Sequence, residues 1–147
     1  MTAQNIHLNK IKEHMQALKE SIVAGIENRP ASIGFHTSAC AIDILELYLH
    51  KIGKIQIGAQ IKHEWFKRPK AGQKVMPLAE RKLRVDFQNK KEILEFMYTF
   101  EENRNKLIYG NSTKSEIKLM IDTFDKYKQL MAEMLSKQGV EIESSDN

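Results

Sequence analysis

The sequence contains few of the residues that would indicate a disulfide-rich, fibrous or membrane protein. Its 147 residues include one cysteine, three prolines and seven glycines. The lone Cys40 excludes an internal disulfide, so the fold does not depend on an oxidising compartment. No apolar run approaches the roughly 18–20 residues of a membrane span, and the N-terminus lacks the charged-then-apolar pattern of a signal peptide. We therefore expect a cytoplasmic protein with no membrane association.

Apolar residues recur at intervals of three and four in four stretches, which is the pattern of amphipathic helices. They predict helices over residues 6–27, 33–52, 89–109 and 113–138. The second is apolar on most sides and is expected to be central. No stretch alternates with the period of two of a β-strand. The predicted fold is all-α, an up-and-down four-helix bundle over residues 1–140, followed by a disordered acidic tail at 141–147.

Local signals mark where these helices begin and end. Pro30 ends the first helix, Ser32 is the expected N-cap of the second, and Gly53 is expected to close it. Thr113 and Glu116 match the two ends of a capping box that starts the last helix. The connection over residues 54–89 is irregular, and a connection of this length is either functional or partly mobile.

Positive charge is concentrated in this connection. Residues 62–91 hold ten Lys or Arg and three acidic residues, whereas the whole chain carries a net charge of +4. Aromatic rings beside basic side chains suit unpaired nucleotides, and Trp65 and Phe66 lie within this segment. The alternative is a solvated loop whose aromatics anchor it in the core. Five residues are the candidate contacts to nucleic acid or nucleotide: Lys62, Lys67, Arg68, Lys70 and Lys74.

Arg104 interrupts the apolar stripe of the third predicted helix, where Leu or Met is expected. A buried guanidinium is costly unless it is paired, so this position needs a reason. One reason is a functional cleft, with Asn105 and Tyr109 sharing a face one turn apart. The other is an ion pair with Glu101 at the edge of the stripe.

The segment Arg104-Asn105-Lys106-Leu107-Ile108-Tyr109-Gly110 resembles the motif of the HEPN family, an Arg-Asn followed by three residues and a His-Gly. The helix from His36 to Gly53 resembles that family's second helix. The resemblance implies a homodimer with the motif in a cleft between subunits, where the Arg holds an RNA phosphate and the His transfers protons. Tyr109 stands where the His is expected, and a phenol is a poor general base at neutral pH.

We therefore expect an RNA- or nucleotide-binding protein, with Arg104, Asn105 and Tyr109 as the candidate catalytic residues. Metal-independent ribonuclease activity remains open. The alternative is a non-catalytic helical partner of a nucleotidyltransferase in a toxin–antitoxin-like pair.

A polar stripe of His36, Asp43, Glu46 and His50 crosses the second helix at intervals of seven, three and four. It is either a metal site or cleft lining that faces Arg104, or the solvated edge of a buried helix. The spacing lacks the Glu-x-x-His pairs of di-iron bundles, so no metal and no cofactor is expected. In the functional interpretation, Asp43 or Glu46 pairs with Arg104 and His36 supports them.

Overall fold

The computed structural model describes residues 3–142, and within them it is helical without any strand. The four long helices are α1 (Ala3–Val23), α2 (Pro30–Lys51), α4 (Lys90–Tyr109) and α5 (Lys114–Ser136). Three short elements complete the fold: η1 (Ile26–Asn28), η2 (His63–Phe66) and α3 (Leu78–Lys82). The prediction of an all-α protein is confirmed.

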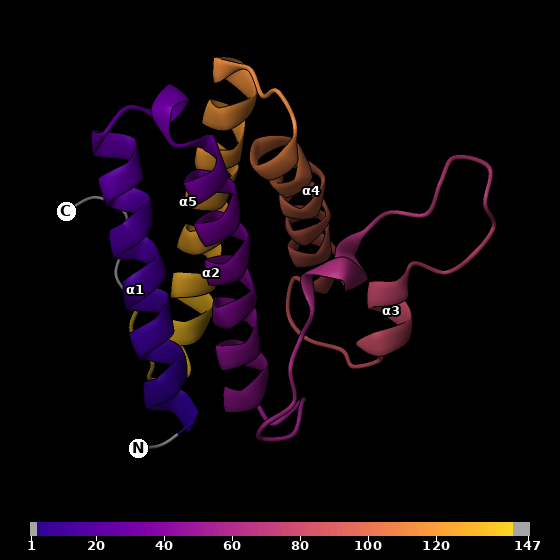
Figure 1. The fold of residues 1–147 in the computed structure, drawn as a ribbon. Coiled ribbons are helices and arrows are strands. Elements are labelled where there is room, and N and C mark those ends of the chain that lie inside the picture. The colour runs from indigo at the N-terminus through magenta and orange to yellow at the C-terminus, as the bar shows by residue number, and fades with distance from the viewer. Residues whose placement is uncertain (1–2, 143–147) are drawn as a thin grey trace.

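Helix α2 is the centre of the structure (Figure 1). It packs against α1, α4 and α5, and each long helix runs opposite to the one before it along the chain. Aromatic side chains of α4 and α5 fill the space beside it, and the Tyr127 hydroxyl donates a 2.7 Å hydrogen bond to the Ala41 carbonyl. Apart from Phe35, the large apolar side chains of α2 are thus mostly covered within one chain, so its composition no longer calls for a second subunit.

Most of the predicted helix ends are confirmed. Gly53 has φ +73°, and the amides of Gly53 and Lys54 donate to the carbonyls of His50 and Leu49. This is the Schellman pattern that a glycine favours. At the start of α5, the Glu116 amide donates to Thr113 Oγ1 at 3.1 Å and the Thr113 amide donates to Glu116 Oε1 at 2.8 Å, which is a complete capping box.

The predicted N-cap at Ser32 is wrong. Helix α2 begins at Pro30, because Arg29 has non-helical angles and proline is well suited to the first helical position. Ser32 lies inside the helix, where its hydroxyl bonds the Ser21 hydroxyl of α1 at 2.7 Å. Helix α1 likewise ends at Val23 and leaves the following residues to η1, instead of continuing to residue 27.

The connection between α2 and α4 projects to one side of the long helices (Figure 1). Phe66 is fully buried against Tyr98, which matches the expectation that aromatics anchor this segment in the core. Arg68 binds both Glu95 and Glu102 of α4 and lies over the Tyr98 ring. At the other end of the chain, Ile142 packs on the core, and residues 143–147 of the predicted tail lie outside the described residues.

Gly34 sets the closest approach between α2 and α4. A Cβ atom at this position would lie 2.8 Å from Leu107 Cβ and 3.5 Å from the Arg104 carbonyl oxygen. Because Leu107 Cβ is attached directly to the backbone, rotation of the side chain cannot relieve that contact. Glycine at this position therefore determines how closely Arg104 sits to α2.

We predict that Gly34→Ala destabilises the protein. The overpacking penalty of about 1–3 kcal/mol should exceed the gain of about 1 kcal/mol in helix propensity. Urea denaturation followed by circular dichroism measures the change, with Ala31→Gly on the exposed side of α2 as a reference for propensity alone. An unchanged or increased free energy of unfolding for Gly34→Ala would contradict this account of the helix contact.

Candidate functional site

A cleft of about 310 Å³ lies between α2, α4 and the start of the connection, with Lys10 of α1 at its edge. Four segments of the chain contribute charged or titratable residues to its lining. Some of them were predicted from the sequence and others were not: Lys10, Asp43, Glu46, Lys62, His63, Glu64 and Arg104. Phe35, nearly half exposed, supplies an aromatic face at the same opening. Cationic, acidic and aromatic groups are thus within reach of one ligand.

Arg104 is half-buried in this cleft and forms no ion pair among residues 3–142. A guanidinium nitrogen of Arg104 makes a weak contact of 3.5 Å with Asn105 Oδ1. The alternative partner, Glu101, is instead bonded to His63. Asp43 and Glu46 line the same cleft but do not pair with Arg104, because other groups hold their carboxylates. The predicted pairing across the core is therefore absent.

His63 also lines the cleft, although it is not among the candidate site residues predicted from the sequence. Its Nδ1 lies 2.8 Å from Oε1 of Glu101, which is 5% exposed, and its Nε2 lies 3.1 Å from Oε1 of the exposed Glu64. Glu101 comes one helical turn before Arg104 on α4, so the imidazole held by Glu101 reaches the arginine's cleft. Only weak signals in the sequence indicated this pair: His63 lies in the basic segment, and Glu101 lies on the same face of the helix as Arg104.

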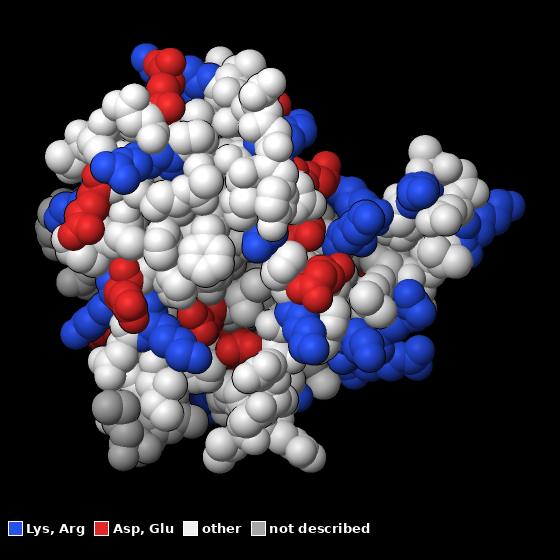
Figure 2. Space-filling model, in the orientation of Figure 1, with Lys and Arg blue, Asp and Glu red and all other residues white. Residues whose placement is uncertain are grey.

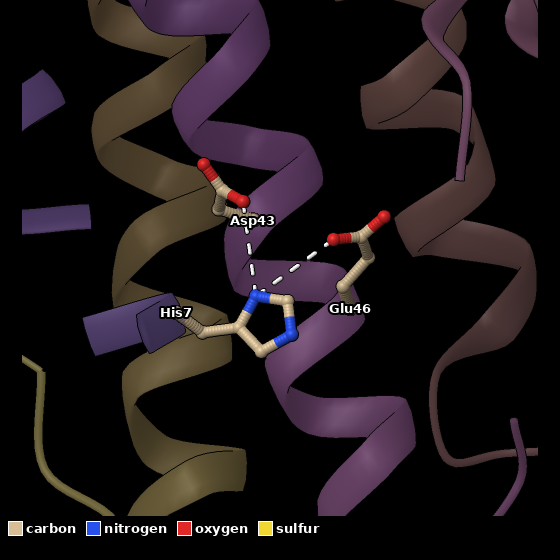
Figure 3. Close-up of side chains that lie close together, drawn as sticks. All are labelled: His7, Asp43 and Glu46. Atoms are coloured by element: carbon tan, nitrogen blue, oxygen red, sulfur yellow. Dashed lines mark ion pairs between the residues drawn. The ribbon is translucent and has the colours of Figure 1, made fainter. Parts of the chain in front are cut away.

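The polar stripe of α2 is not a solvated edge. Asp43 and Glu46 are buried, at 8% and 7% exposed, and they face His7 of α1 (Figure 3). His7 Nδ1 lies 3.8 Å from Asp43 Oδ1 and 3.7 Å from Glu46 Oε1. His36 extends the same seam, with its Nδ1 2.9 Å from His14 Nδ1. The stripe is a polar contact between α1 and α2.

Burial dominates the acid–base properties of this seam. It raises the pKa of Glu46 to about 6, although the Ile61 amide, donating at 2.5 Å, favours the carboxylate. Burial also lowers the pKa of His7, and the nearby Asp43 opposes that effect. Sequence analysis missed His7 because the stripe of α2 does not show which residues of α1 will face it.

The other predicted residues, except Lys62, lie outside the cleft lining. Tyr109 is 79% exposed near the end of α4, and Asn105 is exposed beside Arg104. Lys62 lines the cleft, whereas Lys67, Lys70 and Lys74 are exposed on the projecting connection and Arg68 is bound to α4.

Basic side chains gather over the projecting connection and α3 (Figure 2). A second hollow, of about 620 Å³, lies at the base of this region. It is lined by Arg84, Lys90 and Lys91 together with Glu80 and Glu95. Apart from Lys62, the basic segment thus presents its charge on a surface separate from the Arg104 cleft.

Comparison of the chain with family models, with curated proteins and with solved structures gives no match. Among the described residues, no helix is both long and apolar enough to cross a membrane. The site therefore has to be interpreted from its own geometry.

We predict that Glu46→Gln stabilises the metal-free protein at neutral pH. The pKa of Glu46 is about 6 in the folded protein against an ordinary 4.5, so its contribution to stability is complete below pH 4.5 and is lost as the pH rises to about 6. At pH 7 the loss is about 1–2 kcal/mol. Glutamine can still accept from Ile61, and its amide can donate to His7.

Urea unfolding of both proteins at several pH values, with a chelator present, measures this difference. The variant should match the wild type at pH 4 and exceed it at pH 7. A stability difference that does not change between these two pH values would contradict the assigned cause.

Proposed function

We propose that this chain is an RNA- or nucleotide-binding protein in which Arg104 holds a phosphate group. The observation that supports the proposal is a half-buried arginine that lines a cleft without an ion-pair partner in the part of the chain described, residues 3–142. A guanidinium can fork onto two phosphate oxygens, and Lys62 and Lys10 add positive charge at the same opening. Phe35 offers a face on which a base can stack.

The HEPN resemblance supports the same proposal from the sequence. Four long helices that alternate in direction, with the Arg104 motif at the end of the third, agree with that family's topology. The family assignment remains part of the proposal, as does the homodimer that it implies. Since α2 is covered within one chain, the dimer now depends on the resemblance alone.

His63 supports the further proposal of metal-independent ribonuclease chemistry. Its imidazole can take over the role that Tyr109 is unsuited to, because Glu101 orients the ring and leaves Nε2 beside an exposed and displaceable Glu64. At that nitrogen, His63 would accept the proton of a ribose 2′-hydroxyl. The 2′-oxygen then attacks the adjacent phosphorus, the 5′-oxygen of the next nucleotide leaves and takes a proton from water, and Arg104 binds the charged phosphate oxygens.

We predict that Arg104→Ala weakens binding of a labelled single-stranded RNA by about 10- to 100-fold, the range expected for a lost hydrogen bond to a charged group. Fluorescence anisotropy at fixed salt measures the affinity. Arg29→Ala is the matched control, because Arg29 is an exposed arginine outside both the cleft and the basic segment. Arg104→Lys should recover only part of the affinity, because an ammonium lacks the fork geometry.

A second variant, with Lys67, Lys70 and Lys74 all changed to Gln, separates the cleft from the basic loop. It leaves Arg68 in place, because that arginine holds the connection to α4. The triple variant should reduce the salt dependence of binding and retain a dependence on Arg104. Equal RNA affinity in the wild type and Arg104→Ala would reject the assigned site, and no binding of RNA or nucleotide by the wild type would favour the role as a protein partner.

We also predict that RNA cleavage, measured on gels with excess chelator, is lost in His63→Gln while RNA binding is retained. Glu101→Gln should reduce cleavage less, because it leaves the imidazole in place but weakens its orientation. Cleavage that persists in His63→Gln would show that another group transfers the proton. Absence of cleavage by the wild type would limit the function to binding.

A further inference from the structure

Three side chains from α1 and α2 converge beside the cleft, and two of them also line it. The three are His7, Asp43 and Glu46, and one donor atom from each lies within 4.8 Å of the other two (Figure 3). His7 is 8% exposed, and its buried Nδ1 has no hydrogen-bond partner. An unsatisfied buried nitrogen that points between two carboxylates needs an explanation.

Each carboxylate is held by one oxygen and leaves the other oxygen facing His7. His14 Nε2 lies 3.4 Å from Asp43 Oδ2, and the Ile61 amide donates to Glu46 Oε2. The remaining oxygens, Asp43 Oδ1 and Glu46 Oε1, lie 3.8 and 3.7 Å from His7 Nδ1. Metal-binding carboxylates are commonly oriented in this way by outer hydrogen bonds.

Ion pairing of a protonated His7 with Asp43 and Glu46 accounts poorly for this arrangement. The distances of 3.7 and 3.8 Å are longer than hydrogen bonds, so a proton on Nδ1 would be poorly shared with either oxygen. A cation between the three groups would contact the His7 nitrogen and one oxygen of each carboxylate at once.

We propose that His7, Asp43 and Glu46 bind a divalent first-row transition metal ion, such as Zn²⁺. Ligand-to-metal distances of about 2.0–2.2 Å place tetrahedral donor atoms about 3.4 Å apart, so the separations of 3.7 and 3.8 Å from His7 to the two carboxylates need only a small inward movement. The neutral imidazole and two carboxylates are the donor types that such ions accept. The sequence argument against a metal found no second helix with matching ligands, whereas in the structure α1 supplies His7.

Asp43 and Glu46 also line the Arg104 cleft, so the open coordination positions face a space that water or a ligand can enter. His50 lies beside the site, with its ring centroid 5.2 Å from that of His7 and its own buried Nδ1 without a partner. It is the candidate for a further ligand. The proposed metal site does not depend on RNA binding.

Isothermal titration of tag-free, chelator-treated protein with zinc chloride tests the proposal without any nucleic acid. We expect one saturable ion per chain and an increase in Tm with zinc. Glu46→Gln should weaken binding by at least about 100-fold, and His14→Gln, which removes a group orienting Asp43, by about 10- to 100-fold. His7→Asn tests the third ligand independently, and circular dichroism confirms that each variant is folded.

The control is His63→Gln, which disrupts the other place where a histidine meets two carboxylates, those of Glu64 and Glu101. It should bind zinc as the wild type does. The proposal is overturned if the wild type shows no saturable binding, if folded Glu46→Gln or His7→Asn binds with unchanged affinity, or if His63→Gln is the variant that loses the ion.

Discussion

The burial of two carboxylates on the central helix constrains the rest of the structure. Asp43 and Glu46 lie on α2, a helix whose other sides are covered by apolar packing. Buried acids are tolerated only with polar partners. Helix α1 supplies His7 and His14, and the connection supplies the Ile61 amide. Together with the apolar contacts of Ile11 and Leu18, this requirement holds α1 against α2, and it attaches the long connection to α2 through Ile61.

That attachment also assembles the cleft. Once Ile61 is bonded to Glu46, His63 follows two residues later and reaches Glu101 of α4. Arg104 lies one turn further along α4, and Gly34 allows the two helices to approach closely at that level. The same packing thus brings the carboxylates of Asp43 and Glu46 and the guanidinium of Arg104 to one cleft. A phosphate-binding arginine, a positioned imidazole and a candidate metal site share one opening.

The sequence predicted what depends on local chemistry and missed what depends on neighbours distant in the chain. The three-and-four spacing identified the long helices, and the Thr113 capping box was correct because both of its bonds lie within four residues. Arg104 was recognised as a charge in an apolar stripe, and it does line a cleft. Its lack of a carboxylate partner and the contribution of His7 could not be predicted, because they depend on which helix faces α2 and in which register.

The most direct test of the account is to map where RNA contacts the folded protein. Amide chemical shifts of ¹⁵N-labelled protein, followed during titration with a short single-stranded RNA, report the contact surface residue by residue. The account predicts that the largest perturbations fall on Ile61, His63 and Arg104, which line the cleft from the connection and from α4. Perturbations confined to residues 67–74 and 84–91, with those three amides unchanged, would contradict it.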